Sequence, residues 1–203
     1  MINHHFVFCN TLNIKFQFQR IGLLFYTSIF YFFIACGQSQ SKLPFVMQGE
    51  LDLQNLTPRE EAIFLNGNWE FYPEKFLLQE DEFQSSQKEK IFLPVPGNWN
   101  EIFRNGCGYG TFRLKVKLPN HWIFPISLKL FEQGTAYRLF VNKEEIAKNG
   151  IVGRTKQETK PLAFPLVTHP IPPAFDLEII AHVSNFHFRE GGLWYPILLG
   201  NEK

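Results

Sequence analysis

The stretch YGTFRLKVKL at residues 109–118 alternates apolar and polar side chains over most of its length. One set of alternate positions carries apolar side chains, at Phe112, Leu114, Val116 and Leu118. The other set carries hydroxyl or cationic side chains, at Thr111, Arg113, Lys115 and Lys117. Because successive side chains of a strand point to opposite faces, this pattern predicts a β-strand with one buried face and one solvent-facing face.

Similar period-two patterns recur in PISLKLFEQG (125–134), TAYRLFVNKEE (135–145) and FDLEIIAHVSN (175–185). Glycine, proline and asparagine interrupt them, as expected where strands are joined by turns. No segment of residues 36–203 sustains a helical period. We therefore predict an all-β domain over residues 57–203, built as an antiparallel β-sandwich.

An uncharged apolar run, IGLLFYTSIFYFFIA, occupies residues 21–35 and follows a segment whose only charged residues are Lys15 and Arg20. As a helix it would be about 22 Å long, which is shorter than the roughly 30 Å hydrocarbon core of a bilayer. A basic lead, an apolar segment and a final small residue are typical of a secretory signal peptide. We predict a signal helix over residues 1–35. The alternatives are an uncleaved membrane anchor and a buried core helix.

The sequence FIAC at residues 33–36 resembles the lipobox of bacterial lipoproteins. This resemblance implies cleavage before Cys36 and attachment of lipid to its thiol, with residues 36–56 as a lipidated tether. It also implies a location in the bacterial cell envelope, on the outer membrane or on the periplasmic face of the inner membrane. Two or three acyl chains, at about 0.8 kcal/mol per buried CH₂, hold a protein firmly on a bilayer. The membrane is therefore an expected partner.

Removal of this leader leaves 18 of the 20 basic residues against 19 acidic residues. Such a balance gives no reason to expect nucleic acid as a partner. Cys9 leaves with the leader and Cys36 carries lipid, so Cys107 is expected to be the only free thiol. No intrachain disulfide is then expected, and the stability of the mature chain must come from its core.

Five motifs follow one another over about residues 60–200. They are GNWEFY (67–72), VPGNWN (95–100), GYGTFRLKV (108–116), AYRLFVNKEEIAKNG (136–150) and VSNFHFREGGLW (183–194). This series resembles the galactose-binding-like jelly roll at the N-terminus of β-galactosidases and β-glucuronidases. It also resembles the extracellular sensor domain of bacterial seven-transmembrane receptors with diverse intracellular signalling modules.

The resemblance implies a recognition domain rather than an enzyme. In the glycosidases the catalytic carboxylates lie in a barrel beyond the sandwich, and no barrel or set of membrane helices follows the motifs in this sequence. We therefore expect no catalytic residues and no enzymatic activity. The Val-Asn-Gly turn of the family reads Val141-Asn142-Lys143 here. The hairpin must hold Lys143 at positive φ or use another turn.

Two polar loops carry the candidate ligand-binding side chains. A tryptophan face suits the apolar C–H groups of a sugar, and amide and guanidinium groups suit its hydroxyls. The candidates are Asn98, Trp99, Asn100 and Arg104 in the first loop, and Asn185, His187, Arg189 and Trp194 in the second. Core packing is the alternative for Trp99 and Trp194, and it is the role that we expect of Trp69.

No metal site, cofactor or catalytic nucleophile is predicted. His182 and His187 lack the further ligands that zinc requires, and the sequence has no Gly-x-Ser-x-Gly elbow and no phosphate-binding loop. Glu132 and Glu178 are interpreted as solvent-facing strand residues. We predict a lipid-anchored domain that recognises a carbohydrate, a small metabolite or a membrane protein. The alternatives are a structural or protein-interaction lipoprotein, and the sensor fragment of a larger receptor or cyclase.

Overall fold

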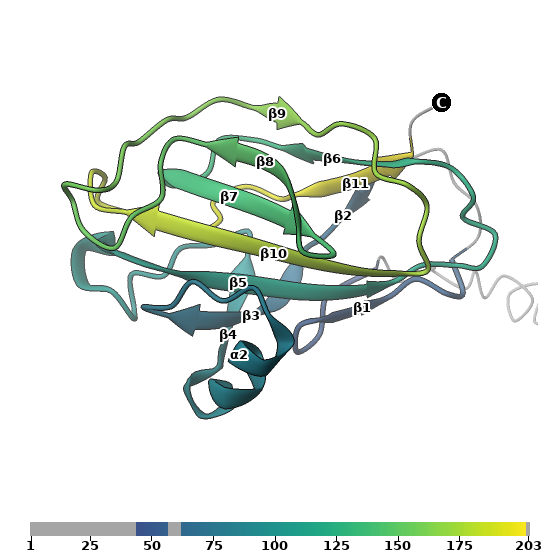
Figure 1. The fold of residues 1–203 in the computed structure, drawn as a ribbon, viewed down its shortest axis with the longest axis horizontal. Coiled ribbons are helices and arrows are strands. Elements are labelled where there is room, and N and C mark those ends of the chain that lie inside the picture. Colours follow the sequence, from purple (N-terminus) through teal and green to yellow (C-terminus); the bar gives the residue numbers. More distant parts are fainter. Residues whose placement is uncertain (1–43, 57–61, 202–203) are drawn as a thin grey trace, which may run out of the picture. The chain divides into compact units, whose positions relative to one another are not determined.

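The computed structural model describes residues 44–56 and 62–201 (Figure 1). The predicted signal helix over residues 1–35 and the predicted lipidation site at Cys36 lie outside the described residues. Within the described part of the chain, no helix has the length and apolar character needed to cross a bilayer.

The strands form two sheets that face each other across a shared core (Figure 1). The larger sheet has the order β4 (Ile91–Val95), β3 (Gly67–Pro73), β5 (Gly108–Lys117), β10 (Asp176–Asn185), β7 (Ala136–Val141) and β8 (Glu144–Asn149). The smaller sheet has the order β2 (Ile63–Phe64), β11 (Leu198–Asn201), β6 (Ile126–Leu130) and β9 (Leu166–Val167). All neighbours in these two series pair antiparallel. The prediction of an all-β, antiparallel sandwich is confirmed.

The inner faces of the two sheets enclose the main core. The apolar positions predicted from alternation are buried there, among them Phe112, Leu114 and Val116 of β5, Ile179 and Ala181 of β10, and Leu128 and Leu130 of β6. Burial of one such side chain contributes roughly 1.5–3 kcal/mol. Trp69 also lies in this core, as predicted, and its indole Nε1 donates a hydrogen bond to the carbonyl oxygen of Leu65 at 2.9 Å.

The sandwich begins before the predicted boundary at residue 57. Val46, Leu51 and Leu53 are buried in the main core. Strand β1 (Glu50–Asp52) pairs in parallel with β5 at residues 115–117, beyond the part of β5 that pairs with β3. It therefore supplies backbone partners that this end of β5 would otherwise lack. Residues 44–56, predicted as the second part of the tether 36–56, belong to the folded domain.

A second, smaller core lies on the outer face of the larger sheet. The segment 74–90, which contains α2 (Glu80–Ser85) and the 3-10 turn η1 (Gln87–Glu89), crosses this face (Figure 1). Phe83 of α2 is fully buried and packs with Tyr72, Leu77, Phe140 and Ile180. The carboxylate of Glu82 fixes the start of α2, because it accepts hydrogen bonds from the backbone N–H groups of Leu78 and Gln79, both at 2.8 Å.

This cover buries polar positions of β5 that alternation predicts to face solvent. Thr111 is inaccessible, and Arg113 is 2% exposed. The hydroxyl of Thr111 accepts a hydrogen bond from Leu77 N at 3.0 Å and donates one to the carbonyl oxygen of Lys75 at 2.7 Å. The prediction of a fully solvent-facing side is wrong for these two residues, because the covering side chains come from a segment distant in the sequence.

The turn between β7 and β8 consists of Asn142 and Lys143, whose φ angles are 49° and 72°. Positive φ at both central residues defines a type I′ hairpin turn, whose twist matches that of the flanking strands. Lys143 therefore occupies, at positive φ, the position where the resembling domains carry glycine. The side chain of Asn142 supports the turn from β10, since its Oδ1 accepts a hydrogen bond from Glu178 N at 2.8 Å.

Replacement of Lys143 with glycine should stabilise the protein. The left-handed conformation costs a residue with a Cβ about 1–2 kcal/mol, and glycine offsets part of that gain through its larger unfolded-state entropy. We expect Lys143→Gly to raise the free energy of unfolding by about 0.5–1 kcal/mol in urea titrations. Lys148→Gly, at an exposed position within β8, is the matched control and should be destabilising. A change of the same sign in the free energy of unfolding of both variants would contradict the cost assigned to the positive φ of Lys143.

Candidate functional site

The loops that follow β4, β6 and β10 meet at one end of the sandwich, on the left of Figure 1. We call this end the rim. Backbone hydrogen bonds join the first and third of these loops, since Gly97 N donates to Leu193 O at 2.8 Å and Trp99 N donates to Gly191 O at 3.0 Å. The loop after β6 joins them through a backbone bridge between residues 134 and 192. The rim is therefore one connected surface.

Asn185, the last residue of β10, holds the rim loops together from inside. Its side chain is inaccessible to solvent. Its amide Nδ2 donates to the carbonyl oxygens of Gly106, Phe188 and Glu190 at 2.9, 2.7 and 3.0 Å. Its Oδ1 accepts hydrogen bonds from Thr135 Oγ1 and from the backbone N–H of Phe188, both at 3.1 Å. Asn185, predicted to bind ligand, is instead occupied in organising the loops.

Trp99, also predicted to bind ligand, is fully buried. Its ring stacks on Phe112, with 6.0 Å between ring centroids and 10° between planes. Its indole Nε1 donates to Gly106 O at 2.9 Å. The loop at Gly191 closes over the indole so tightly that a Cβ there would lie 2.2 Å from Nε1. Trp99 therefore offers no ring face to a ligand, and the alternative of core packing describes it.

Three other predicted residues lie at the rim without lining its cavity. Asn100 joins two loops, since its Nδ2 donates to Arg189 O at 2.8 Å. His187 is exposed, and its ring Nε2 lies 3.0 Å from the carbonyl oxygen of Thr159. Arg104, in the 3-10 turn η2 (Arg104–Gly106), is exposed. The first two are loop contacts, and the third faces solvent.

A cavity of about 480 Å³ opens between the rim loops. Its lining combines aromatic, charged and amide side chains: Gly97, Asn98, Glu132, Phe188, Arg189, Glu190, Trp194 and Tyr195. Three of the eight predicted ligand-binding residues therefore line it, namely Asn98, Arg189 and Trp194. We call this hollow the rim cavity.

Three aromatic rings contribute to the rim cavity. Phe188 and Tyr195 are each 48% exposed, and the ring centroid of Trp194 lies 5.2 Å from that of Phe188. The indole of Trp194 covers Gly134, where a Cβ would come within 2.0 Å of the ring. Gly134 is thus required at this position, because any larger residue would displace the indole.

The polar side of the rim cavity carries both signs of charge. Glu132 is exposed, and Glu190 is paired with Arg189, with 3.6 Å between Oε1 and the guanidinium Nε. The sequence pattern predicts Glu132 on a strand face, and it does not single out Phe188 or Tyr195. The available signal was the occurrence of aromatic residues inside a loop, next to Arg189 and Trp194, where no strand alternation accounts for them.

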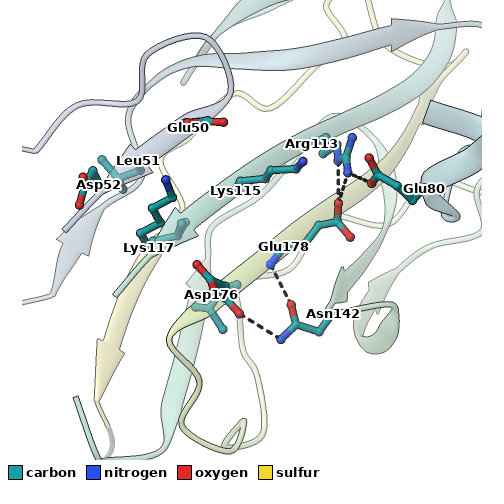
Figure 2. Close-up of a pocket in the computed structure, with 12 residues that line it drawn as sticks. Glu50, Leu51, Asp52, Glu80, Arg113, Lys115, Lys117, Asn142, Asp176 and Glu178 are labelled. Atoms are coloured by element: carbon teal, nitrogen blue, oxygen red, sulfur yellow. Dashed lines mark hydrogen bonds and ion pairs between the residues drawn. The ribbon is translucent and has the colours of Figure 1, made fainter. Parts of the chain in front are cut away.

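A second hollow, of about 320 Å³, lies on the outer face of the larger sheet over β1, β5 and β10 (Figure 2). The cations of β5 stand between acidic residues of the neighbouring strands, in two cross-strand rows: Glu50–Lys115–Glu178 and Asp52–Lys117–Asp176. At one end, Arg113 donates from Nε to Glu178 Oε1 at 2.7 Å and forms an ion pair with Glu80 of α2 (Figure 2).

We interpret the outer hollow as a structural feature of the sheet. Opposite charges on adjacent strands stabilise strand pairing, and every cation here has acidic neighbours. No aromatic ring is among its lining residues. Within residues 44–56 and 62–201, no group of three His, Cys, Asp or Glu side chains is placed to hold a metal ion. The rim cavity is therefore the candidate binding site.

The smaller core on the outer face should make stability depend on pH. Burial lowers the pKa of His182, and the charge of Arg138 acts in the same direction, against the hydrogen bond to Leu77 O and the charges of Glu82 and Glu145. The unfolded chain then binds a proton at a higher pH than the folded chain does, so stability is lost as the pH falls. We expect the urea concentration at the midpoint of unfolding to fall as the pH is lowered from about 7.5 to about 5. The fall should be smaller in His182→Gln. His169→Gln, at an exposed position, should keep the full decrease. An unchanged slope in His182→Gln would contradict the assignment.

Comparison with known proteins shows the fold but no family. The sequence matches no known family and no curated protein. In structure, the chain is similar to a β-glucuronidase of an uncultured Clostridium species, with a TM-score of 0.52 and 16% identity over 79% of this chain and 31% of that chain. It is also similar to the β-glucuronidase of Ruminococcus gnavus in complex with D-glucuronic acid, with a TM-score of 0.51 and 16% identity over 74% of this chain and 32% of that chain.

The chain therefore spans about a third of the length of these enzymes. By its fold, the chain is a β-sandwich domain similar to one region of these β-glucuronidases. This agrees with the galactose-binding-like sandwich predicted from the motifs.

Proposed function

We propose that this protein is a recognition domain that binds a carbohydrate in the rim cavity and does not itself catalyse a reaction. The proposal rests on the composition of the cavity, which combines three aromatic rings with two carboxylates, a guanidinium and an amide. Aromatic faces pack against the C–H faces of sugars, and the polar groups pair with hydroxyls. The fold shared with regions of β-glucuronidases supports the same class of ligand.

The absence of catalysis is proposed from the carboxylates of the cavity. Hydrolysis of a glycoside requires two carboxyl groups that face each other across the bond to be cleaved. Glu190 instead pairs with Arg189, while Glu132 forms no ion pair within the described residues. Incubation with aryl glycosides should therefore release no product above the uncatalysed rate. Release that is lost in Glu132→Gln would contradict this part of the proposal.

The proposal includes a lipid anchor and an extracytoplasmic location. It is supported by the apolar run at residues 21–35 and by the lipobox-like sequence that ends at Cys36. Mass spectrometry of the protein from bacterial membranes should find Cys36 as the first residue and a diacylglyceryl group on its sulfur. An unmodified thiol in a chain that retains residues 1–35 would rule out the anchor.

A glycan and metabolite array probed with the purified protein tests the binding function. Once a ligand is found, Trp194→Ala should weaken binding about tenfold or more, equivalent to about 1.4 kcal/mol, because it removes a stacking surface. Arg189→Ala should also weaken binding. Arg104→Ala is the matched control, since both arginines are exposed on rim loops but Arg104 does not line the cavity.

Equal losses in Arg189→Ala and Arg104→Ala would place the ligand elsewhere. Uniform absence of binding by a folded sample would favour the alternative of a structural or protein-interaction lipoprotein. The observation that favours this alternative is the complete burial of Trp99, whose indole N–H is already satisfied.

A further inference from the structure

Two stretches of the sequence, LPNHWIFPI (118–126) and PLAFPLVTHPIPPAF (161–175), contain no Asp, Glu, Lys or Arg. Charged residues make up 19% of the chain as a whole. The first stretch contains the connection from β5 to β6, and the second contains the connection from β9 to β10. Loops of this composition are unusual on a surface that faces only water.

The structure brings the two loops together at the end of the sandwich opposite the rim, on the right of Figure 1. Leu118 N donates to Phe175 O at 2.7 Å, and Ile126 and Ile171 exchange two backbone hydrogen bonds at 2.9 and 2.7 Å. These bonds join the two ends of the first loop to residues 171 and 175 of the second. The loops therefore form one continuous surface rather than two separate projections.

Large apolar side chains project from this surface into solvent. Ile123 is 70% exposed, Phe124 is 47% exposed and Phe175 is 58% exposed. Trp122 is half-buried beside them. We call these four residues the apolar tip. Exposed apolar patches of this kind mark sites of contact with a protein or a membrane.

The backbone of the same loops is poor in hydrogen-bond donors. Five of the 13 prolines of the chain lie in the two connections at this end, residues 118–125 and 168–175, and proline has no backbone N–H. An unpaired N–H that leaves water for an apolar medium costs several kcal/mol in the bilayer core, so a proline-rich loop enters lipid at a lower cost than an ordinary loop does. A tryptophan at the edge of an apolar segment is typical of the membrane interface.

We propose that the apolar tip inserts into the interfacial layer of a lipid bilayer. A protein partner fits these loops less well. Protein interfaces usually have a polar border with charged and hydrogen-bonding side chains, and these loops contain no Asp, Glu, Lys or Arg. The insertion would hold the sandwich with its rim cavity directed away from the membrane. It does not depend on the identity of the ligand, nor on binding at the rim.

Quenching of tryptophan fluorescence by brominated lipid tests the proposal on the full chain. The protein is added to vesicles of phosphatidylethanolamine and phosphatidylglycerol that contain lipid brominated near the glycerol end of the acyl chains. We expect quenching of the wild-type emission and loss of the quenched component in Trp122→Phe, because the remaining tryptophans lie in the core or at the rim. Equal quenching in the two proteins would overturn the proposal.

A triple variant separates membrane contact from folding. Ile123→Ser, Phe124→Ser and Phe175→Ser together should abolish the quenching of Trp122 and leave the urea midpoint nearly unchanged, because the replaced side chains are exposed. Ile102→Ser with Ile151→Ser, two exposed apolar residues outside these stretches, is the matched control and should retain the quenching.

Analytical ultracentrifugation tests whether a second copy of the chain, rather than lipid, covers this surface. A wild-type dimer that becomes a monomer in the triple variant, without quenching of Trp122 by lipid, would show that the tip joins two copies of the chain and would overturn membrane insertion. Quenching that persists in the triple variant would also overturn it.

Discussion

Arg113→Met is expected to lower the free energy of unfolding by about 3 kcal/mol, the lower end of the cost of removing one partner from a buried ion pair. Methionine keeps the apolar part of the side chain but leaves the carboxylates of Glu70, Glu80 and Glu178 without the guanidinium that they share. The interaction of the guanidinium with the ring of Phe83, whose centroid is 4.0 Å away, is also lost. Urea unfolding followed by tryptophan fluorescence measures the change.

Arg138→Met provides the matched control for this prediction. Arg138 makes the same two kinds of contact, an ion pair with one carboxylate, that of Glu145, at 2.5 Å and a contact with the ring of Phe140, whose centroid is 5.0 Å away. Its side chain is 45% exposed, so water replaces most of what the substitution removes. We expect a loss of less than about 1 kcal/mol. Equal losses in the free energy of unfolding in Arg113→Met and Arg138→Met would show that burial does not strengthen the interactions of Arg113.

Asn185→Ala should destabilise the protein by about 3–4 kcal/mol and abolish binding at the rim cavity. The substitution removes the side-chain donor of the carbonyl oxygens of Phe188 and Glu190, while Gly106 O keeps only the indole N–H of Trp99. Each lost hydrogen bond costs about 1–3 kcal/mol. Urea unfolding measures the first effect. Hydrogen exchange measures the loosening of the loop that should abolish binding, because the amides of residues 186–192 should lose protection in the variant.

Asn185→Asp tests whether hydrogen bonding, rather than side-chain size, explains the effect. The carboxylate has nearly the same shape, but it would face the same three carbonyl oxygens as an acceptor in a buried site. We expect it to be at least as destabilising as alanine. Asn100→Ala, at a partly exposed position of the same rim, should cost about 1 kcal/mol. A stable Asn185→Asp protein would contradict the role given to the amide.

Alternation of side chains predicted the sheets well, because the inner faces of this sandwich are uniformly apolar. It could not predict the burial of Arg113, since a cation at a polar position reads as solvent-facing unless the covering segment is known. The cover includes Phe83, which belongs to a segment that is otherwise polar. The three residues of β1 are too few to show a period, so the start of the domain was placed too late.

The rim was only partly predictable, because loops have no period to follow. Polar composition selected both loops, and three of the selected residues line the cavity. It could not separate ligand-binding side chains from loop-organising ones, since the chemistry that pairs with a sugar hydroxyl also satisfies a backbone carbonyl, as in Asn185. Trp99 has asparagine on both sides, and the rings that bury it, Phe71 and Phe112, come from distant strands.

Almost all hydrogen bonds of Asn185 end on main-chain atoms, and Thr135 is the exception. Main-chain atoms do not change when a side chain is replaced. The residues at positions 188, 189 and 190 can therefore vary in size and charge while the loop keeps its path. Under the proposed function, substitutions at these few exposed positions would change the specificity without disturbing the scaffold, and a combinatorial library for altered selectivity should be built there.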